Sequence, residues 1–305
     1  MKANAVNTPA IGAWRDYLAL CKPKIVALII FTAIVGMFLA VQGMVPVDAL
    51  VFGTLGIGLA AASAAVINHV VDQRVDAIMM RTKQRPLPKG NITMESAVLF
   101  AAALAVAAMV ILIYFVNGLT AILTLVSLIG YGFVYSMYLK RATPQNIVIG
   151  GASGAAPPVL GWTSVTGTLE ADSLLLFLII FAWTPPHFWA LAIYRRDEYA
   201  QAAIPMLPVT HGVEFTRLHI LYYTVVLFLV SLLPFVFYMS GAMYLFGAVV
   251  LGSAFLYLAI RMQRDHSNKL AMQTFSYSII YLMALFAFLL ADHYLPAAVR
   301  MYTSA

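Results

Sequence analysis

Apolar runs of about 20 residues recur along the whole chain, and they constrain its fold more than any other feature. A run of this length, wound as an α-helix, crosses the roughly 30 Å hydrocarbon core of a bilayer. Because 63% of the residues are apolar and only 10% are charged, a pair of soluble domains is excluded despite the length of 305 residues. The chain is expected to be an integral membrane protein.

Nine transmembrane helices are predicted from these runs, so the expected fold class is all-α. The predicted spans are residues 25–44, 50–71, 94–115, 118–139, 146–165, 173–194, 218–239, 242–261 and 275–295. They would form one transmembrane domain, residues 25–295. A tail of residues 1–24 would precede it and a short tail of residues 296–305 would follow.

The Lys and Arg residues alternate with the predicted spans. On one side lie Lys2, Arg15, Lys22 and Lys24, then Arg74, Arg81, Lys83, Arg85 and Lys89, then Lys140 and Arg141, then Arg195, Arg196 and Arg217, then Arg261, Arg264 and Lys269; only Arg300 lies on the other. Since Lys and Arg collect in cytoplasmic loops, this pattern predicts a cytoplasmic N-terminus and a periplasmic C-terminus in a bacterial plasma (inner) membrane. It also explains the net charge of +6 without a nucleic-acid partner.

The start of the chain lacks the apolar region and cleavage site of a signal peptide, and it is read as a cytoplasmic tail. The single cysteine, Cys21, excludes an internal disulfide and a thiolate metal cage.

Three oxygen-bearing side chains follow one another at the end of the second predicted span, at a spacing of four residues. They are Asn68, Asp72 and Asp76. In an α-helix, this spacing places them on one face. Carboxylate and carboxamide oxygens are hard ligands that Mg²⁺ takes together with water and substrate phosphates. The pattern therefore predicts an Mg²⁺ site that binds a diphosphate.

Basic residues follow at once, at Arg74, Arg81, Lys83 and Arg85. Because guanidinium groups match phosphate oxygens, these residues are predicted to bind the diphosphate. The alternative is a solvated helix end with Asp and Arg paired at the membrane surface. Repeated ionisable groups on one face at the edge of a span favour a site, since charges there are costly.

The loop after the sixth predicted span carries a second polar set, formed by Tyr194, Arg195, Arg196, Asp197 and Glu198. Tyr194 and Glu198 are again four residues apart. Two acidic sites facing each other across a bundle could hold two Mg²⁺ ions on one diphosphate and neutralise the charge it gains as a leaving group. Tyr194, Arg195 and Arg196 are therefore predicted to bind the diphosphate, and Asp197 or Glu198 the second metal ion.

The stretch WTPPHFWALAIY, residues 183–194, places His187 among aromatic side chains inside the sixth span. A histidine there can simply pack, but it can also contact haem, since imidazole is a common axial ligand, or handle protons. The aromatics can stack on a flat ring, face a carbocation or face lipid. His187 and Trp189 are therefore candidate haem-binding residues. His187 lies two helical turns, about 10 Å, deeper in the bilayer than the acidic residues.

The fifth predicted span is rich in Gly, Ala and Ser and contains Pro157 and Pro158. This composition is typical of tight helix packing, and also of a broken helix that lines a cavity.

Several of these stretches resemble a known family. NHVVDQRVDAIMMRTKQRPLP, residues 68–88, resembles the first Asp-rich motif of the UbiA superfamily of intramembrane prenyltransferases, in the form used by its haem-farnesylating branch. DYLALCKPKI, SGAAPPVLGW and WTPPHFWALAIYRRDEYAQAAIPMLPV resemble the same branch, in its order and at its spacing. The resemblance covers nearly the whole chain.

This resemblance implies a nine-helix UbiA-type bundle with a central cavity, Mg²⁺ as cofactor, and farnesyl diphosphate and haem b as substrates. The product would be haem O for a terminal oxidase, with haem A synthase or oxidase assembly proteins as candidate partners. Asn68, Asp72 and Asp76 would bind Mg²⁺-diphosphate, and with Arg81 and Glu198 they are the expected catalytic residues. Arg81, Lys83 and Arg85 would contact the diphosphate oxygens. The second motif of the superfamily is often DxxxD, whereas here Tyr194 replaces the first acid, so the second metal ligand stays open between Asp197 and Glu198.

Three alternatives remain at this stage. The first is a related prenyltransferase with a quinone or chlorophyllide acceptor, against which the TPPHFW stretch argues. The second is a transporter, which should carry ionisable groups near the middle of its spans. The third is a non-catalytic haem-binding assembly factor, which would need His187 but not Asn68, Asp72 and Asp76.

Overall fold

The computed structural model describes residues 13–265 and 267–295, and within these ranges it contains helices and no strands. The expected all-α fold is therefore confirmed. The predicted C-terminal tail, residues 296–305, and the first 12 residues of the predicted N-terminal tail lie outside the described residues.

Seven helical segments in the described part of the chain are long and apolar enough to cross a membrane. They are η1 (Ala49–Gly53) with α3 (Thr54–Ile78), α5 (Met94–Phe115), α6 (Gly118–Ile129) with η2 (Gly130–Leu139) and α7 (Lys140–Ala142), α10 (Ala171–Tyr194), α13 (Val213–Val236), α14 (Ala242–Arg264) and α15 (Asn268–His293). An eighth arises if α1 (Trp14–Leu20) and α2 (Pro23–Leu39), which meet at 53°, form one broken span. The predicted number of nine is therefore approximate.

The fifth predicted span accounts for the difference in number. It consists of two ten-residue helices, α8 (Asn146–Ala155) and α9 (Pro157–Thr166). Each would be about 15 Å long, which is too short to cross a bilayer alone. The break falls at Ala156 because Pro157 and Pro158 have no N–H to donate to the preceding turn and fit the start of a new helix instead. The break in this span is therefore confirmed, whereas its lining of a cavity stays a prediction.

Tight packing is present as well, between α9 and α2. A Cβ atom on Gly161 would overlap the backbone oxygen of Ala33, and one on Gly36 would overlap the backbone oxygen of Pro158. The two backbones are therefore in direct contact, which only residues without a side chain permit.

Several predicted span ends differ from the structure: α13 begins at Val213 and not at residue 218, and α15 begins at Asn268 and not at residue 275. α2 ends at Leu39, not at residue 44, and the following loop contains Gly43 at a φ of 125°.

α3 continues to Ile78, seven residues past the predicted end. The polar residues of its last turns belong to the same regular helix. The helix thus carries Asp72 and Asp76 beyond the predicted end of the apolar run.

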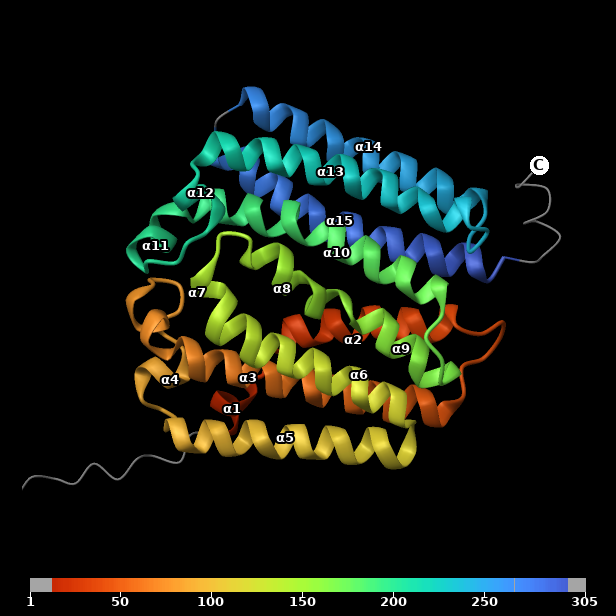
Figure 1. Cartoon of the computed structure of the whole chain (residues 1–305), viewed down its shortest axis with the longest axis horizontal. Coiled ribbons are helices and arrows are strands. Elements are labelled where there is room, and N and C mark those ends of the chain that lie inside the picture. The colour runs from red at the N-terminus through yellow and green to blue at the C-terminus, as the bar shows by residue number, and fades with distance from the viewer. Residues whose placement is uncertain (1–12, 266, 296–305) are drawn as a thin grey trace, which may run out of the picture.

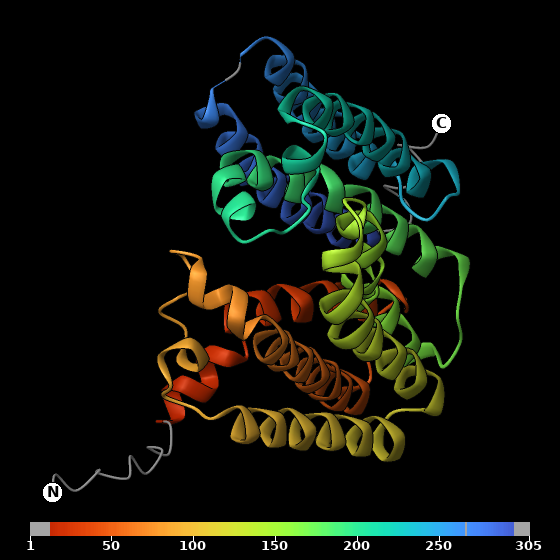
Figure 2. The same cartoon turned by 60° about the vertical axis from the view of Figure 1, so that its left-hand side comes forward.

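The long helices lie side by side with their axes roughly aligned (Figure 1). α3 packs against α5 in one part of the bundle, and α10 packs against α13 and α15 in the other. Figure 2 shows α6 to α9 connecting these two parts. Three short helices, α4 (Pro86–Lys89), α11 (Arg196–Gln201) and α12 (Leu207–Thr210), lie together at one end.

The loops that follow α3 and α10 meet at this end. Met79 of the first loop packs in one hydrophobic cluster with Ile204 and Met206 of the second. The C-terminal end of α15 lies at the other end of the bundle, where the Tyr294 hydroxyl donates to the backbone oxygen of Gly43 at 3.0 Å. The two polar loops therefore lie at the same end of the bundle, and the side of the membrane that this end faces stays a prediction.

Candidate functional site

Asn68, Asp72 and Asp76 lie on one buried face of α3, as their spacing predicts. Their exposed fractions are 6%, 2% and 3%. The Nδ2 of Asn68 donates to Asp72 Oδ2 at 3.1 Å, which is the contact expected between side chains four residues apart on a helix. Carboxylates buried to this degree are stable only when opposite charges or a metal compensate for their lost hydration. A solvated helix end is therefore excluded.

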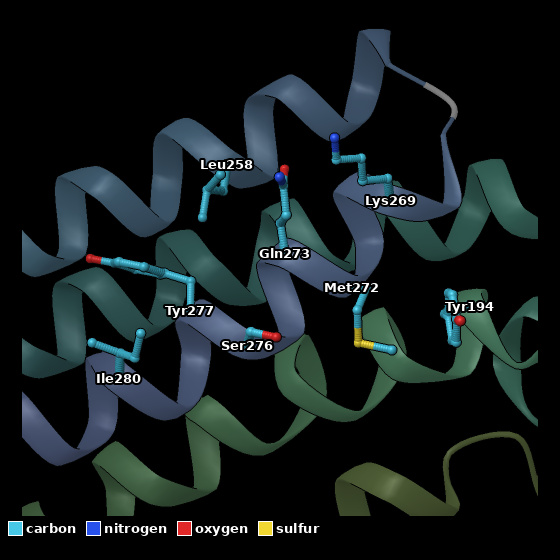
Figure 3. Close-up of a pocket in the computed structure, with 8 residues that line it drawn as sticks. All are labelled: Tyr194, Leu258, Lys269, Met272, Gln273, Ser276, Tyr277 and Ile280. Carbon is cyan, nitrogen blue, oxygen red and sulfur yellow. The ribbon is translucent and has the colours of Figure 1, made fainter.

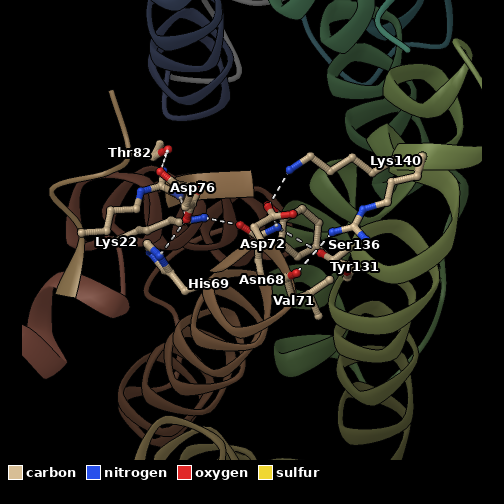
Figure 4. Close-up of polar contacts among 12 residues, drawn as sticks. Lys22, Asn68, His69, Val71, Asp72, Asp76, Thr82, Tyr131, Ser136 and Lys140 are labelled. Atoms are coloured by element: carbon tan, nitrogen blue, oxygen red, sulfur yellow. Dashed lines mark hydrogen bonds and ion pairs between the residues drawn. The ribbon is translucent and has the colours of Figure 1, made fainter. Parts of the chain in front are cut away.

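Three cations from three other segments surround this face, and Figure 4 labels two of them, Lys22 and Lys140. The Nζ of Lys22 donates to Asn68 Oδ1 at 2.6 Å, and the Nζ of Lys140 donates to Asp72 Oδ2 at 2.5 Å. Arg85 donates from Nη1 to Asp76 Oδ2 at 2.6 Å. Basic side chains therefore surround both carboxylates, an arrangement that suits a highly charged anion.

Lys22 reaches this position through an unusual backbone conformation. It stands between α1 and α2, where the chain bends by 53°, and its φ of 51° and ψ of 60° are left-handed. Residues other than glycine rarely adopt this conformation, and such strain persists where the surrounding structure requires it. The bend brings a lysine that precedes the first span against Asn68, the first residue of the α3 face.

One oxygen of the cluster has no partner. Asp72 Oδ1 is buried without a hydrogen bond, as are both ring nitrogens of the adjacent His69, whose Nδ1 lies 3.8 Å from Asp76 Oδ2. Because buried polar atoms are nearly always bonded, these atoms indicate a place where a ligand completes the structure. Oxygen donors from Asp72, Asp76 and Asn68 fit Mg²⁺.

No three His, Cys, Asp or Glu side chains in the described ranges gather closely enough to bind a metal by themselves. An ion held here would therefore need the Asn68 oxygen, water or phosphate oxygens to complete its coordination. This composition is what Mg²⁺ in phosphate-binding sites commonly uses.

A π-helical segment supports the site from the opposite side. Within η2, the Ser136 hydroxyl donates to the backbone oxygen of Tyr131 at 2.9 Å and accepts from Asn68 Nδ2 at 3.1 Å. The rings of Tyr131 and Tyr135 stack in the same segment, with centroids 5.4 Å apart. π-helical turns are rare and are found preferentially at functional sites.

The basic residues predicted to bind a diphosphate are distributed unevenly. Arg85 is in the cluster, whereas Arg74, Arg81 and Lys83 are exposed. Although part of the Arg81 side chain is exposed, lost hydration lowers the pKa of its guanidinium, and the charges of Arg85 in the first loop and Arg195 in the second lower it further. Arg81 is therefore placed where an anion entering between the loops would meet it.

The second polar set lies where α10 ends and α11 begins. The Nη1 of Arg195 donates to Glu198 Oε1 at 2.9 Å, and the other carboxylate oxygen, Oε2, is buried without a partner. Asp197 and Arg196 are exposed. Of the two acids left open by the sequence, Glu198 is therefore the one with a buried oxygen available for a ligand.

Tyr199, next in the chain, joins the two sets. Burial raises the pKa of its hydroxyl, while the charges of Arg81 in the first loop and Arg195 in the second act to lower it. Tyr194 lies on the outer side instead. Its side chain, 45% exposed, lines a groove of about 710 Å³ with residues of α15, including Lys269 and Met272 (Figure 3).

His187 is buried between α10 and α15. Its ring stacks on Trp183 and on Phe275, with centroids 4.1 and 4.6 Å away, and its Nδ1 lies 2.6 Å from the Ser278 hydroxyl. Trp189 faces α13, where it meets His219 and Tyr223 edge to face. The structure therefore places the two candidate haem-binding residues against different helices.

Comparison with known proteins identifies the class. The chain matches the UbiA prenyltransferase family over residues 29–291 and belongs to that family. It is 63% identical to the protoheme IX farnesyltransferase of Nitrosococcus oceani over 94% of this chain and 96% of that protein. It is 60% identical to the enzyme of the same name from Methylococcus capsulatus, over 97% and 99% of the two chains.

Solved structures with low sequence identity share the fold. A structure of digeranylgeranylglyceryl phosphate synthase superposes with a TM-score of 0.78 at 18% identity, over 92% of this chain and 98% of that one. A UbiA homolog from Archaeoglobus fulgidus bound to GPP and Mg²⁺ superposes with a TM-score of 0.59 at 17% identity, over 90% and 99%. The expected UbiA-type bundle is confirmed, and the transporter and assembly-factor alternatives give way to a prenyltransferase.

Sequence reasoning missed several residues of the cluster. Lys22 and Lys140 carried only a topological signal, because each stands far from Asp72 in the chain. His69 was passed over although it lies inside the Asp-rich motif, and Ser136 had no signal at all, since its contact depends on a π-helical turn.

Proposed function

We propose that this protein transfers the farnesyl group of farnesyl diphosphate to a vinyl group of haem b and that water then adds, giving haem O and diphosphate. The observation that carries the proposal is the buried α3 face with its three surrounding cations, an arrangement that suits a diphosphate. Relatives that are 57–63% identical over nearly the whole chain are named protoheme IX farnesyltransferase, which favours haem over a quinone or chlorophyllide as the acceptor.

In this proposal the diphosphate lies between the α3 face and the loop after α10. Lys22, Lys140 and Arg85 turn from their present partners toward its oxygens, and Arg81 and Arg195 approach from the other loop. Asn68, Asp72 and Asp76 would hold Mg²⁺, and Glu198 would be the acid for a second ion. Bound Mg²⁺ would neutralise the negative charge that develops on the leaving diphosphate.

The bond between C1 of the farnesyl chain and the diphosphate oxygen breaks, and its electron pair leaves with the diphosphate. Charged side chains fixed around the leaving group stabilise it without reorganisation. The stacked rings of Tyr131 and Tyr135 lie close to this point and are suited to face a carbocation. The apolar helices keep water away from the cation at this stage.

The terminal carbon of the haem vinyl group then bonds to C1, and the positive charge moves to the vinyl carbon next to the porphyrin. Water adds to that carbon and loses a proton, which leaves a hydroxyethylfarnesyl group. We assign the haem to the region of His187. This residue lies on α10, deeper in the bilayer than Glu198 of α11. The polar loops would then face the cytoplasm of a bacterial inner membrane, with the C-terminus in the periplasm and haem A synthase or oxidase assembly proteins as recipients of the product.

The test is an assay of the purified full-length protein with haem b, farnesyl diphosphate and Mg²⁺, read by mass spectrometry of the extracted haem. The expected product carries one farnesyl group and one hydroxyl group more than haem b. A parallel reaction with 4-hydroxybenzoate as acceptor should give no prenylated product. If haem b stays unmodified while 4-hydroxybenzoate is prenylated, the acceptor assignment is wrong and the prenyltransferase class remains.

A further inference from the structure

Ser278 of α15 makes two short hydrogen bonds through one hydroxyl group. Its Oγ lies 2.6 Å from the backbone oxygen of Phe275 and 2.6 Å from Nδ1 of His187. A serine hydroxyl has one proton to donate and can accept through its lone pairs. The carbonyl of Phe275 can only accept, so it takes the hydroxyl proton.

Both contacts are satisfied together in one arrangement only. The Ser278 hydroxyl donates to Phe275, and the Nδ1–H of His187 donates to the Ser278 oxygen. In a neutral imidazole the proton on Nδ1 leaves Nε2 with a free lone pair. No residue in the described ranges forms a hydrogen bond with this Nε2.

We infer that Ser278 is a positioning residue that holds His187 in the Nδ1–H form, so that Nε2 is presented as an axial ligand to the iron of haem b. The inference rests on the proposed function, which places haem near His187. Histidines that ligate metals commonly donate their other ring N–H to a fixed acceptor, which sets both the tautomer and the ring orientation. Ser278 is such an acceptor here.

The surrounding contacts fix the ring in the same orientation. His187 is stacked between Trp183 and Phe275, which prevents a flip that would exchange the two nitrogens. Trp183 also donates from Nε1 to the backbone oxygen of Ser278 at 2.7 Å. Because this last bond uses the backbone, it survives any substitution of the Ser278 side chain.

Ser278→Ala therefore removes the acceptor of His187 and leaves the Trp183 bond that ties α10 to α15. Ser278→Thr retains the hydroxyl. Ser276→Ala is the matched control, since Ser276 is an exposed serine on the same helix and lines the outer groove (Figure 3). His187→Ala removes the ligand itself.

The experiment titrates haem b into the purified full-length proteins and records the affinity and, for the ferrous form, the iron–histidine stretching band by resonance Raman spectroscopy. We expect Ser278→Ala to weaken haem binding by about 10- to 100-fold and to lower the band frequency, because loss of the N–H acceptor makes the imidazole a poorer donor. Ser278→Thr and Ser276→Ala should match the unsubstituted protein. Binding of Mg²⁺ and farnesyl diphosphate, measured in parallel, should be equal in all variants.

Two outcomes would overturn the inference, and they separate it from the proposed function. If His187→Ala abolishes the band but Ser278→Ala leaves affinity and frequency unchanged, Ser278 has no positioning role and the haem assignment stands. If the unsubstituted protein turns over haem b but shows no iron–histidine band, or the band persists in His187→Ala, iron is not ligated by His187 and the role of Ser278 falls with it.

Discussion

The ammonium group of Lys140 lies 2.5 Å from Asp72 Oδ2, across the interface between the end of η2 and the α3 face. The two residues are 68 positions apart in the chain, and both side chains are largely buried. Such a pair is stable because each charge compensates for the lost hydration of the other. When a diphosphate binds, the same lysine can turn to its oxygens without leaving the site.

Lys140→Gln should therefore reduce turnover by about 100-fold or more, the loss typical of removing one fixed group that stabilises developing negative charge. Steady-state rates of prenyl transfer measure this effect. Lys89→Gln, at an exposed lysine of α4 on the same side, is the control and should leave the rate unchanged. Equal rates in the two variants would show that Lys140 serves only to neutralise Asp72.

Asp72→Asn and Asp76→Asn should each abolish turnover while the protein remains folded in the membrane. Carboxamides keep the size of the side chains but lose the charge that binds Mg²⁺. Prenyl transfer at saturating Mg²⁺ and elution of the folded protein by size-exclusion chromatography are the measurements. Retained transfer in both variants would mean that the acids of α3 are not metal ligands.

The periodic and compositional features of the chain were predictable. Spacing alone placed Asn68, Asp72 and Asp76 on one face, and the Lys/Arg alternation brought the loops after α3 and α10 to the same end of the bundle. These features depend on interactions within a helix or on each span's relation to the bilayer. They do not require knowledge of which helices touch.

The partners of that face were not predictable, because they depend on tertiary contacts. Lys22 reaches Asn68 through a left-handed backbone bend, and Ser136 reaches it through a π-helical turn. Neither deviation has a marker in hydrophobic periodicity. The break at Ala156 did have one, in Pro157 and Pro158, but prolines also occur inside continuous spans, as Pro185 and Pro186 do in α10.

The two polar loops should be labelled from the same, cytoplasmic side. In a Cys21→Ser background, single cysteines at Lys83 and Gln201, both exposed, should react with a membrane-impermeant maleimide in inverted vesicles and not in intact cells. Tyr238→Cys, at an exposed residue at the opposite end of α13, should show the reverse pattern. Labelling of positions 83 and 201 from different sides would rule out a site shared by the two loops.

Glu198→Gln should lower the rate of prenyl transfer far more than Asp197→Asn. Glu198 has one carboxylate oxygen paired with Arg195 and the other buried without a partner, whereas Asp197 is exposed. We expect a loss of about 100-fold for Glu198→Gln and less than twofold for Asp197→Asn. The Mg²⁺ dependence of the rate is the second measurement, and a rightward shift for Asp197→Asn alone would reverse the assignment of the second metal ligand.

Gly161→Ala should destabilise the bundle, because the new Cβ would meet the backbone oxygen of Ala33 and neither backbone can move without separating α2 from α9. Overpacking of this kind costs about 1–3 kcal/mol, or more where the obstacle is backbone. The apparent Tm, measured in detergent from the fraction that elutes as folded protein after heating, should fall by several degrees.

Gly154→Ala in α8 is the matched control. No atom lies within 4 Å of its added Cβ, so the helix propensity of alanine should leave the Tm unchanged or raise it. A fall in Tm of equal size for both variants would mean that the loss at position 161 comes from glycine flexibility and not from the contact between α2 and α9.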